Sequence, residues 1–526
     1  MSSLRSVAYI APSFGFPHVT TQIHTKQHLR VAVVHANFRE PAYARDVVPF
    51  RTLLPAGRQY ALTWAVEDSW GGMTSAMLHR SRAFVRLGRR PVSVLTFDPD
   101  PDYPARETRL RADGRLVEGM SLLNLWDWLR EHPLPGGSLA LDKHPFTPLA
   151  ELPEAAGETF AERRRGDAVL SRVRRSSSGE VLQTDHFRVD GSLLLSERRD
   201  VAERGALGGK SVVLCDHDGR PVRSWGRIAH LYRAWLDALT RRHPSFLVVD
   251  SKTVARWVLE YRRVHAVTVH VVHASHLAGL ERPHGTLRES RRAVFENLSA
   301  FDAVAVLTPR QRDDIVALLG PQDNLEVVPN SRDLPAAPRL TGRAPGAGVM
   351  LASLTARKRV QHAVEAITGL RARGVDVALD IWGEGEEREQ LAALADDGVR
   401  LRGHAPDAAA RLEEASFLLS TSTSEGFPLV LVEALAAGCI PIAYDVPYGP
   451  ADIIDDGVNG FLVPAGDVSA LADAVARLVA MPEDERGRMR AAAVKSARRF
   501  TDASVTREWG RVMRRARRRK LRHPDR

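Results

Sequence analysis

Short hydrophobic runs alternate with longer amphipathic segments over most of the chain. The apolar run 60–66 is followed by the pair Gly71-Gly72, a helical pattern over 73–88 and a second apolar run over 90–97. Strand-length runs that alternate with helix-length segments indicate βαβ units and a parallel sheet. This first unit therefore predicts an α/β fold.

The same alternation returns in two later stretches of the chain. A Pro/Gly-rich segment over 335–348 lies between them and is typical of an interdomain linker. We therefore expect two Rossmann-like domains followed by helices. The expected boundaries are 58–98 together with 212–334 for the N-terminal domain, 335–485 for the C-terminal domain and 486–526 for the C-terminal helices with their basic tail.

Residues 99–211 do not follow this alternation. Their early part is rich in Pro, Arg and Asp, and strand-like runs then flank Asp190-Gly191 and Asp218-Gly219. Asp-Gly dipeptides favour hairpin turns. We expect 99–211 to be a β-rich, mainly antiparallel subdomain inserted into the N-terminal domain. Residues 1–57 show no clear period and are treated as an extension of uncertain order.

The composition is that of a multidomain globular protein. The chain has 526 residues, of which 44% are hydrophobic and 26% charged, and this suits two or three packed domains. No run approaches the roughly 20 apolar residues that span a bilayer, and the start lacks a secretory signal pattern. Cys215 and Cys439 fall in expected core elements, so buried thiols are expected rather than a disulfide. These features predict a cytoplasmic protein.

The net charge of +10 is partly local, because the tail from Arg511 holds nine Lys/Arg and one Asp. This tail is either a solvated helix or a surface that attracts anionic lipid headgroups or a polyanionic acceptor. The second interpretation places the protein peripherally at the inner face of the plasma membrane. No nucleic-acid partner is expected, since neither an aromatic-interleaved basic motif nor zinc-finger spacing is present. A homo-oligomer remains open.

The strongest functional pattern lies within 416–464. An apolar run ends at Glu425-Gly426-Phe427-Pro428, and a helical pattern then continues to Gly438. Glu425 stands at the N-terminus of this helix, and Glu433 lies about two turns inside it. The free N–H groups of a first helical turn favour a phosphate, and nearby carboxylates accept the protons of sugar hydroxyls. The combination indicates a nucleotide-sugar site.

The sequence SEGFPLVLVEALAAG over 424–438 resembles the donor signature of retaining family 4 glycosyltransferases. The continuation over 444–463 is similar to bacterial enzymes that glycosylate poly(glycerol phosphate) or poly(ribitol phosphate) teichoic acids, and to relatives that glycosylate serine-rich proteins. The resemblance implies the GT-B fold, in which two Rossmann-like domains face a cleft. It also implies a UDP-sugar co-substrate and neither a metal nor another cofactor.

The resemblance assigns roles to the residues around the cleft. Glu425 would contact the donor sugar near its anomeric carbon, and Glu433 the ribose. The glycine pair would lie beside the donor phosphates, and the C-terminal domain would supply the uracil and ribose contacts. The residues expected to bind the donor are Gly71, Gly72, Arg357, Gly383, His404, Gly426, Phe427, Leu429, Val430 and Glu433.

Lys358 is expected to act with Glu425 in catalysis. It matches the family lysine that follows the first strand of the second domain, and it would stabilise the leaving diphosphate. The family usually has an arginine five residues earlier, where this chain has Ser353. Arg357 or Arg359 would then have to compensate.

His273 completes the expected catalytic set. It lies at the end of a predicted strand, where α/β sheets place their ligands. It matches the first histidine of the family's V-H-x-x-H segment, which contacts the donor sugar close to the reaction centre. His276, the second histidine of that segment, is the alternative.

These observations predict a retaining hexosyltransferase. It would transfer glucose or N-acetylglucosamine from a UDP-sugar to a hydroxyl of a polyol-phosphate, teichoic-acid-like polymer. Two alternatives stay open: the same chemistry on a protein Ser/Thr or another glycan, and a non-catalytic partner of another glycosyltransferase. Such partners usually lack the donor carboxylates and the lysine, which this chain has, whereas Ser353 is a feature in favour of the partner.

Overall fold

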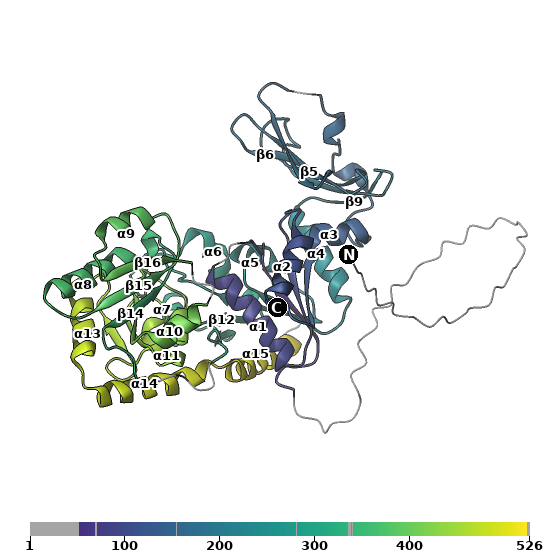
Figure 1. The fold of residues 1–526 in the computed structure, drawn as a ribbon. Coiled ribbons are helices and arrows are strands. Elements are labelled where there is room, and N and C mark those ends of the chain that lie inside the picture. The colour runs from purple at the N-terminus through teal and green to yellow at the C-terminus, as the bar shows by residue number, and fades with distance from the viewer. Residues whose placement is uncertain are drawn as a thin grey trace, which may run out of the picture. The chain divides into compact units, whose positions relative to one another are not determined.

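The computed structural model describes residues 52–68, 71–153, 155–279, 281–334, 338, 340–404 and 407–522 (Figure 1). The expected N-terminal extension therefore lies outside the described residues as far as residue 51, and so do 335–337 and 339 of the expected linker. Residues 51–526 form one unit. Within the described ranges, no helix is long and apolar enough to cross a membrane.

Seven parallel strands form the first sheet, in the order β13-β12-β11-β10-β1-β2-β3. Every residue of β10 and β11 is buried, in agreement with their continuous Val, Leu and Phe runs, because central parallel strands are covered on both faces. The strands are β1 (Arg58–Leu62), β2 (Val92–Thr96), β3 (Met120–Asn124), β10 (Ser245–Val249), β11 (Ala266–Val272), β12 (Ala303–Val306) and β13 (Leu325–Val327). The helices between them are α1 (Gly72–Arg86), α2 (Tyr103–Ala112), α3 (Leu125–Glu131), α4 (Ile228–Thr240), α5 (Lys252–Val258), α6 (Glu289–Phe295) and α7 (Pro309–Leu319).

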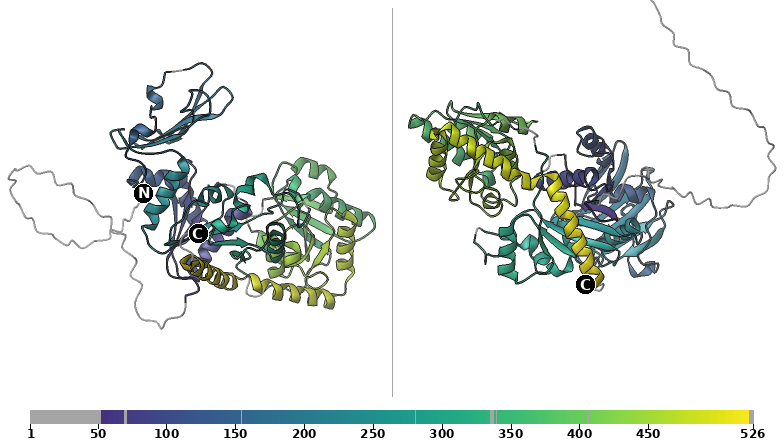
Figure 2. Two further views of the ribbon diagram at one scale, coloured as in Figure 1. Left: turned by 180° about the vertical axis from the view of Figure 1, so that it is seen from behind. Right: turned by 90° about the horizontal axis from the view of Figure 1, so that it is seen from below.

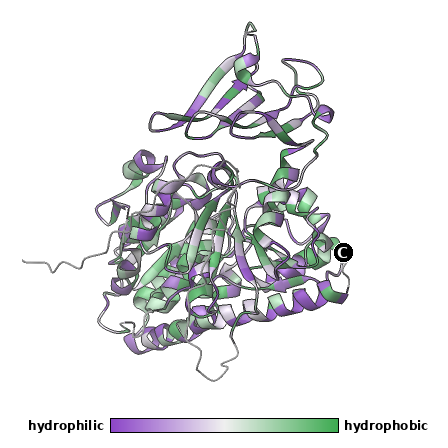
Figure 3. Ribbon diagram, turned by 90° about the vertical axis from the view of Figure 1, so that its right-hand side faces the viewer, coloured by the Kyte–Doolittle hydropathy of each residue, from purple (hydrophilic) through white to green (hydrophobic). Residues whose placement is uncertain are grey.

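Six parallel strands form the second Rossmann-like sheet, in the order β16-β15-β14-β17-β18-β19. The hydropathy colouring of Figure 3 shows hydrophobic residues concentrated on the inner strands of the parallel sheets. The strands are β14 (Ala347–Leu351), β15 (Ala378–Trp382), β16 (Val399–Gly403), β17 (Phe417–Ser420), β18 (Ile440–Tyr444) and β19 (Phe461–Val463). The helices are α8 (Val360–Ala372), α9 (Arg388–Leu394), α10 (Ala408–Glu414), α11 (Leu429–Ala437), α12 (Pro450–Ile453) and α13 (Val468–Ala480).

A separate antiparallel sheet carries six strands in sequential order. With it, the expected fold class is confirmed: two Rossmann-like units and an antiparallel β-rich insertion. The strands are β4 (Thr159–Arg165), β5 (Ala168–Arg175), β6 (Val181–Phe187), β7 (Leu193–Arg198), β8 (Ser211–Cys215) and β9 (Pro221–Trp225).

The limits of this sheet differ from the expected segment 99–211. Strand β3 pairs in parallel with β2, so the chain completes the first Rossmann-like sheet before it enters the antiparallel one. The expectation was wrong here because α2 carries many charged residues and hides the βα rhythm. At the other end, β8 and β9 pair antiparallel with each other, so the antiparallel sheet continues to Trp225.

The last helices connect the two parallel sheets. Helix α14 (Glu483–Ala497) packs against α11, whereas α15 (Asp502–Arg522) packs against α1, β11 and β12 of the first sheet (Figure 2). Several basic groups of α15 are held by acids of the first domain: Lys520 lies 2.7 Å from Asp302, and Arg515 lies 2.8 Å from Glu326. Part of the tail's positive charge therefore fastens this helix to the protein.

Candidate active site

The N-terminus of helix α11 carries backbone amides without a side-chain cap. Pro428 occupies the N-cap position and provides no side-chain cap, so within the described residues no side chain satisfies the first-turn N–H groups. Gly438 ends the helix with φ 69, in the left-handed region that glycine favours. The helix tip can therefore accept an anion such as a phosphate.

Glu425 stands directly before this tip and pairs with two cations. Its Oε1 lies 2.6 Å from Lys358 Nζ and 3.3 Å from Arg357 Nη1. Burial raises the pKa of Glu425, but the Lys358 ammonium outweighs it, and the pKa lies below its ordinary value. Glu425 is therefore ionised and can accept hydrogen bonds from hydroxyl groups.

The turn that carries Lys358 is fixed against the loop after β17. Thr421 Oγ1 donates to the carbonyl oxygens of Lys358 and Arg359 at 2.8 and 2.9 Å, and Thr423 N donates to the carbonyl of Arg357. Arg359 itself is the N-cap residue of α8, with φ 44. Of the two arginines expected to compensate for Ser353, Arg357 is thus the one that reaches Glu425.

His273 and Asp250 form a second pair at the carboxyl edge of the first sheet. Asp250 directly follows β10 and His273 directly follows β11, and His273 Nε2 lies 2.7 Å from Asp250 Oδ1. Arg80 of α1 donates to both oxygens of Asp250, at 2.9 and 2.7 Å. Complete burial would raise the pKa of Asp250, but Arg80 and His273 outweigh it and lower the pKa to about 2.

The two pairs meet where the sheets face each other. A Cβ atom at Gly426 would lie 1.9 Å from the carbonyl oxygen of His273, so only glycine allows this approach. The structure therefore brings all three expected catalytic residues together: Lys358 contacts Glu425, and Gly426, the next residue along the chain, contacts His273.

Glu433 is half-buried and paired with a residue that the sequence analysis did not include. Its Oε1 lies 2.5 Å from Nε of Arg332, which follows β13 in the segment that joins the two sheets. The backbone N–H of Arg332 also donates to the carbonyl of Phe500 at 3.0 Å. A ribose that binds Glu433 would therefore meet Arg332 as well.

The expected glycines fall into two groups. A Cβ at Gly71 or Gly72 would have no neighbour within 4 Å among the residues that the structure describes. Gly383 has φ 153, and its Cβ would lie 1.8 Å from the carbonyl of Ala352, so packing alone explains this glycine. His404 directly follows β16, as Gly383 directly follows β15, and His404 is exposed.

The other expected donor contacts belong to α11. Leu429 and Val430 occupy its first turn and are half-buried, whereas the Phe427 side chain is buried against Phe500, with ring centroids 5.4 Å apart. Phe427 can thus offer only its backbone to a ligand, and its side chain anchors the helix tip to the segment before α15.

His276, the alternative histidine, lies in an apolar slot. Its ring stacks between Phe295 and Tyr448, with centroids at 5.4 and 5.8 Å, and burial lowers its pKa to about 4. Tyr448 comes from the second domain and donates to Asp314 of α7 at 2.7 Å. His276 therefore packs in the interface between the domains, between apolar rings.

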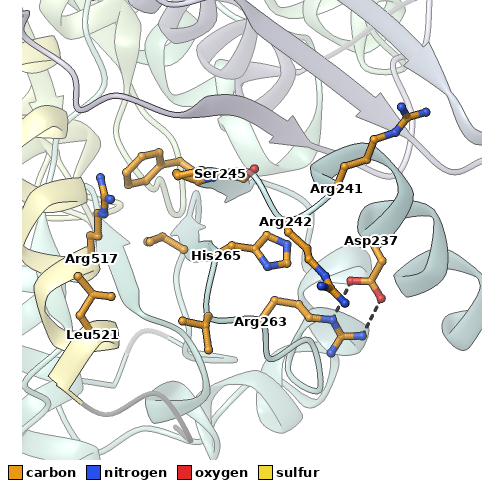
Figure 4. Close-up of a pocket in the computed structure, with 12 residues that line it drawn as sticks. Asp237, Arg241, Arg242, Ser245, Arg263, His265, Arg517 and Leu521 are labelled. Atoms are coloured by element: carbon orange, nitrogen blue, oxygen red, sulfur yellow. Dashed lines mark hydrogen bonds and ion pairs between the residues drawn. The ribbon is translucent and has the colours of Figure 1, made fainter. Parts of the chain in front are cut away.

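A cavity of about 820 Å³ lies at the opposite edge of the first sheet, where β10 begins (Figure 4). Arg241, Arg242, Arg263 and Arg517 line it, and Arg263 is paired with Asp237. None of the expected site residues lines this cavity.

The chain is similar to known glycosyltransferases. Residues 347–481 match the family model "Glycosyl transferases group 1". The poly(glycerol-phosphate) alpha-glucosyltransferase of Bacillus subtilis (strain 168) is 25% identical over 507 residues, covering 87% of this chain and 75% of that protein. The poly(ribitol-phosphate) alpha-N-acetylglucosaminyltransferase of Staphylococcus aureus (strain COL) is 23% identical over 446 residues, covering 78% and 90%.

Solved structures share the fold. The crystal structure of TarM covers 88% of this chain and 99% of its own, with a TM-score of 0.65 and 19% identity. The pneumococcal O-GlcNAc transferase GtfA, in complex with UDP and GlcNAc, covers 87% and 99%, with a TM-score of 0.61 and 21% identity.

Fold and family match define the class: the chain is a glycosyltransferase of the two-Rossmann GT-B type. Among the proteins compared, it is similar over most of its length to bacterial poly(glycerol-phosphate) and poly(ribitol-phosphate) alpha-glycosyltransferases.

Proposed function

We propose that the protein transfers glucose or N-acetylglucosamine from a UDP-sugar to a hydroxyl of a polyol-phosphate polymer, with retention at the anomeric carbon. The observation that carries this proposal is the Lys358–Glu425 pair at the uncapped tip of α11, opposite His273. A diphosphate is bound by cations and N–H donors, here Lys358 and the first-turn amides of α11. A sugar is bound by groups that accept hydrogen bonds from its hydroxyls, here the Glu425 carboxylate and the His273 imidazole.

The leaving diphosphate would be stabilised by fixed positive charge. The tip of α11 offers first-turn N–H groups, and Lys358 and Arg357 flank it. The Arg357 side chain is 51% exposed and is therefore free to turn toward a ligand. Lys358 has three donor hydrogens, so it can keep Glu425 and donate to a phosphate oxygen as well. Positioned donors of this kind lower the barrier because charge develops on the departing oxygen.

The transfer replaces one bond of the anomeric carbon with another. The bond to the β-phosphate oxygen breaks, a bond to the acceptor oxygen forms, and the acceptor proton passes to the departing diphosphate. UDP-glucose and UDP-N-acetylglucosamine carry α-linked sugars, and the relatives are named alpha-transferases. An α-linked product from an α-linked donor is retention, and we propose the same outcome here.

The polyol-phosphate acceptor rests on the relatives' names. A protein acceptor is the second candidate, since UDP-N-acetylglucosamine–peptide N-acetylglucosaminyltransferase GtfA subunits are also relatives: that of Streptococcus gordonii is 27% identical over 318 residues, covering 55% of this chain and 62% of that protein.

Purified protein incubated with UDP-, GDP- and ADP-sugars tests the donor, and an acceptor panel tests the polymer. The panel contains poly(glycerol phosphate), poly(ribitol phosphate) and a Ser/Thr-rich peptide. We expect transfer from a UDP-sugar to one of the polyol phosphates, and loss of transfer in Glu425→Ala without loss of folding. Transfer to the peptide alone would replace the acceptor assignment, and wild-type turnover in Glu425→Ala would overturn the site.

A further inference from the structure

We propose that Asp250 and Arg80 are positioning residues that fix which nitrogen of His273 faces the donor sugar. The inference rests on the proposed function of the cleft and adds two residues to it. Asp250 contacts His273, and Arg80 contacts Asp250, so both would act through the imidazole.

The first step is the direction of the hydrogen bond. Asp250 is an ionised carboxylate whose side chain is fully buried, so it can only accept. The hydrogen at 2.7 Å must therefore sit on His273 Nε2. When the ring is neutral, Nδ1 is then the unprotonated nitrogen, and it is the one left to accept from a sugar hydroxyl.

The second step is what holds Asp250. Arg80 donates to both of its oxygens, at 2.9 and 2.7 Å, and this bidentate geometry fixes the plane of the carboxylate. The Arg80 guanidinium in turn lies over the ring of Trp509, 5.2 Å from its centroid. Trp509 belongs to α15. The C-terminal helix therefore contacts Arg80, which contacts Asp250, which in turn contacts His273.

The third step is the rigidity of the arrangement. The exposed fractions of the three side chains are 9% for Arg80, 0% for Asp250 and 8% for His273. Asp250 and His273 each directly follow a buried strand of the same sheet, and β10 and β11 are adjacent in it. Groups on neighbouring strand ends hold a distance better than groups on a free loop, because their backbones are fixed by the sheet.

Asp250→Asn tests the proposal, because asparagine keeps the shape but has both a donor and an acceptor. We expect kcat for transfer to fall about 100-fold, the effect of misplacing a reacting group, while the KM for UDP-sugar changes little. Arg80→Lys keeps the positive charge but loses the bidentate contact, and a smaller fall in kcat is expected.

The matched control is Asp237→Asn. Asp237 also accepts two hydrogen bonds from one arginine, Arg263, both at 2.7 Å, but it lies at the opposite edge of the sheet (Figure 4). This variant should keep wild-type kcat.

A readout that does not depend on turnover is the nitrogen NMR spectrum of ¹⁵N-histidine-labelled protein, assigned with His273→Asn. The wild type should show His273 protonated at Nε2, and Asp250→Asn should show mixed or Nδ1 protonation. Unchanged kcat in both Asp250→Asn and Arg80→Lys, or an Nδ1-protonated ring in the wild type, would overturn the proposal.

The kinetic measurement and the NMR spectrum test different statements. If the wild type transfers no sugar, the proposed function fails, and the NMR spectrum still decides the hydrogen-bond direction. If Asp250→Asn does not fold, Arg80→Lys carries the kinetic test, with UDP binding as its check on folding.

Discussion

Gly426 lies so close to His273 that a Cβ atom on the glycine would stand 1.9 Å from the histidine's carbonyl oxygen. The two residues belong to different domains. Gly426 precedes α11 of the second domain, and His273 directly follows β11 of the first. This contact places the N-terminus of α11 beside His273, the one expected catalytic residue of the first domain. The proposed donor site therefore depends on a close approach of the two domains.

Gly426→Ala should separate these segments. The clash is with backbone, which cannot rotate away, so the two segments must move apart until the Cβ–oxygen distance exceeds 3.0 Å. We expect kcat/KM for transfer to fall about 100-fold, as for other misplacements of reacting groups. Gly369→Ala is the control, since that glycine is exposed on helix α8 and no other described part of the chain lies within 4 Å of its Cβ. It should keep activity and stabilise the fold by about 0.5–1 kcal/mol. Full activity in Gly426→Ala would contradict the contact.

Lys358→Ala should impair both the leaving group and Glu425. The ammonium is the main group that lowers the pKa of Glu425, so its removal raises that pKa. Glu425 acts as a carboxylate and loses this function when it is protonated. The acid-side fall of the pH–rate profile should therefore move to higher pH. We expect a loss of kcat of about 100-fold or more. Lys495→Ala, on the exposed side of α14, should leave the profile in place. An unshifted acid limb in Lys358→Ala would contradict the pairing.

Glu433→Ala should weaken UDP binding. A hydrogen bond to a charged group contributes about 1.5–3 kcal/mol, so a lost ribose contact corresponds to roughly 10- to 100-fold in Kd by calorimetry. Arg332→Ala leaves Glu433 without its 2.5 Å partner and tests whether that arginine helps to hold the ribose or competes with it. Glu413→Ala, at an exposed position of α10, is the control. Equal UDP affinity in wild type and Glu433→Ala would remove Glu433 from the site.

Acid should selectively remove the contribution of Asp250 to stability. Its pKa is about 2 in the folded protein, below the ordinary aspartate value of 3.8, so the folded state favours the charged form. The stabilisation is therefore complete above the ordinary value and is lost as the pH falls toward the folded one. The difference in Tm between wild type and Asp250→Asn should shrink over that window. A difference that stays constant across the window would mean that Asp250 contributes through packing alone.

The sequence predicted the elements whose apolar runs are long and regular. The runs SFLVVDS and HAVTVHVVHASHL predicted β10 and β11, and the Gly-Phe-Pro turn predicted the start of α11. The limits of the antiparallel sheet were not predicted, because α2 is too polar to show a helical period. Strand pairing, rather than local pattern, assigns β3 to the first sheet.

The partners of the site residues could not be predicted, because they come from distant parts of the chain. Arg332 and Glu433 are 101 residues apart, and Arg80 and Asp250 are 170 apart. One signal was present: Asp250 follows two valines at the end of its run, as His273 does. Two adjacent parallel strands that end in this way place their next residues side by side at the ligand edge.

The central claim is that a UDP-sugar reacts at the tip of α11 with Lys358 and Glu425. The most direct test incubates wild type and Glu425→Ala with UDP-glucose or UDP-N-acetylglucosamine and poly(glycerol phosphate), and follows the anomeric proton of the product by NMR. The account predicts an α-linked product with the wild type and none with the folded, UDP-binding variant. A β-linked product, or equal product from both proteins, would contradict it.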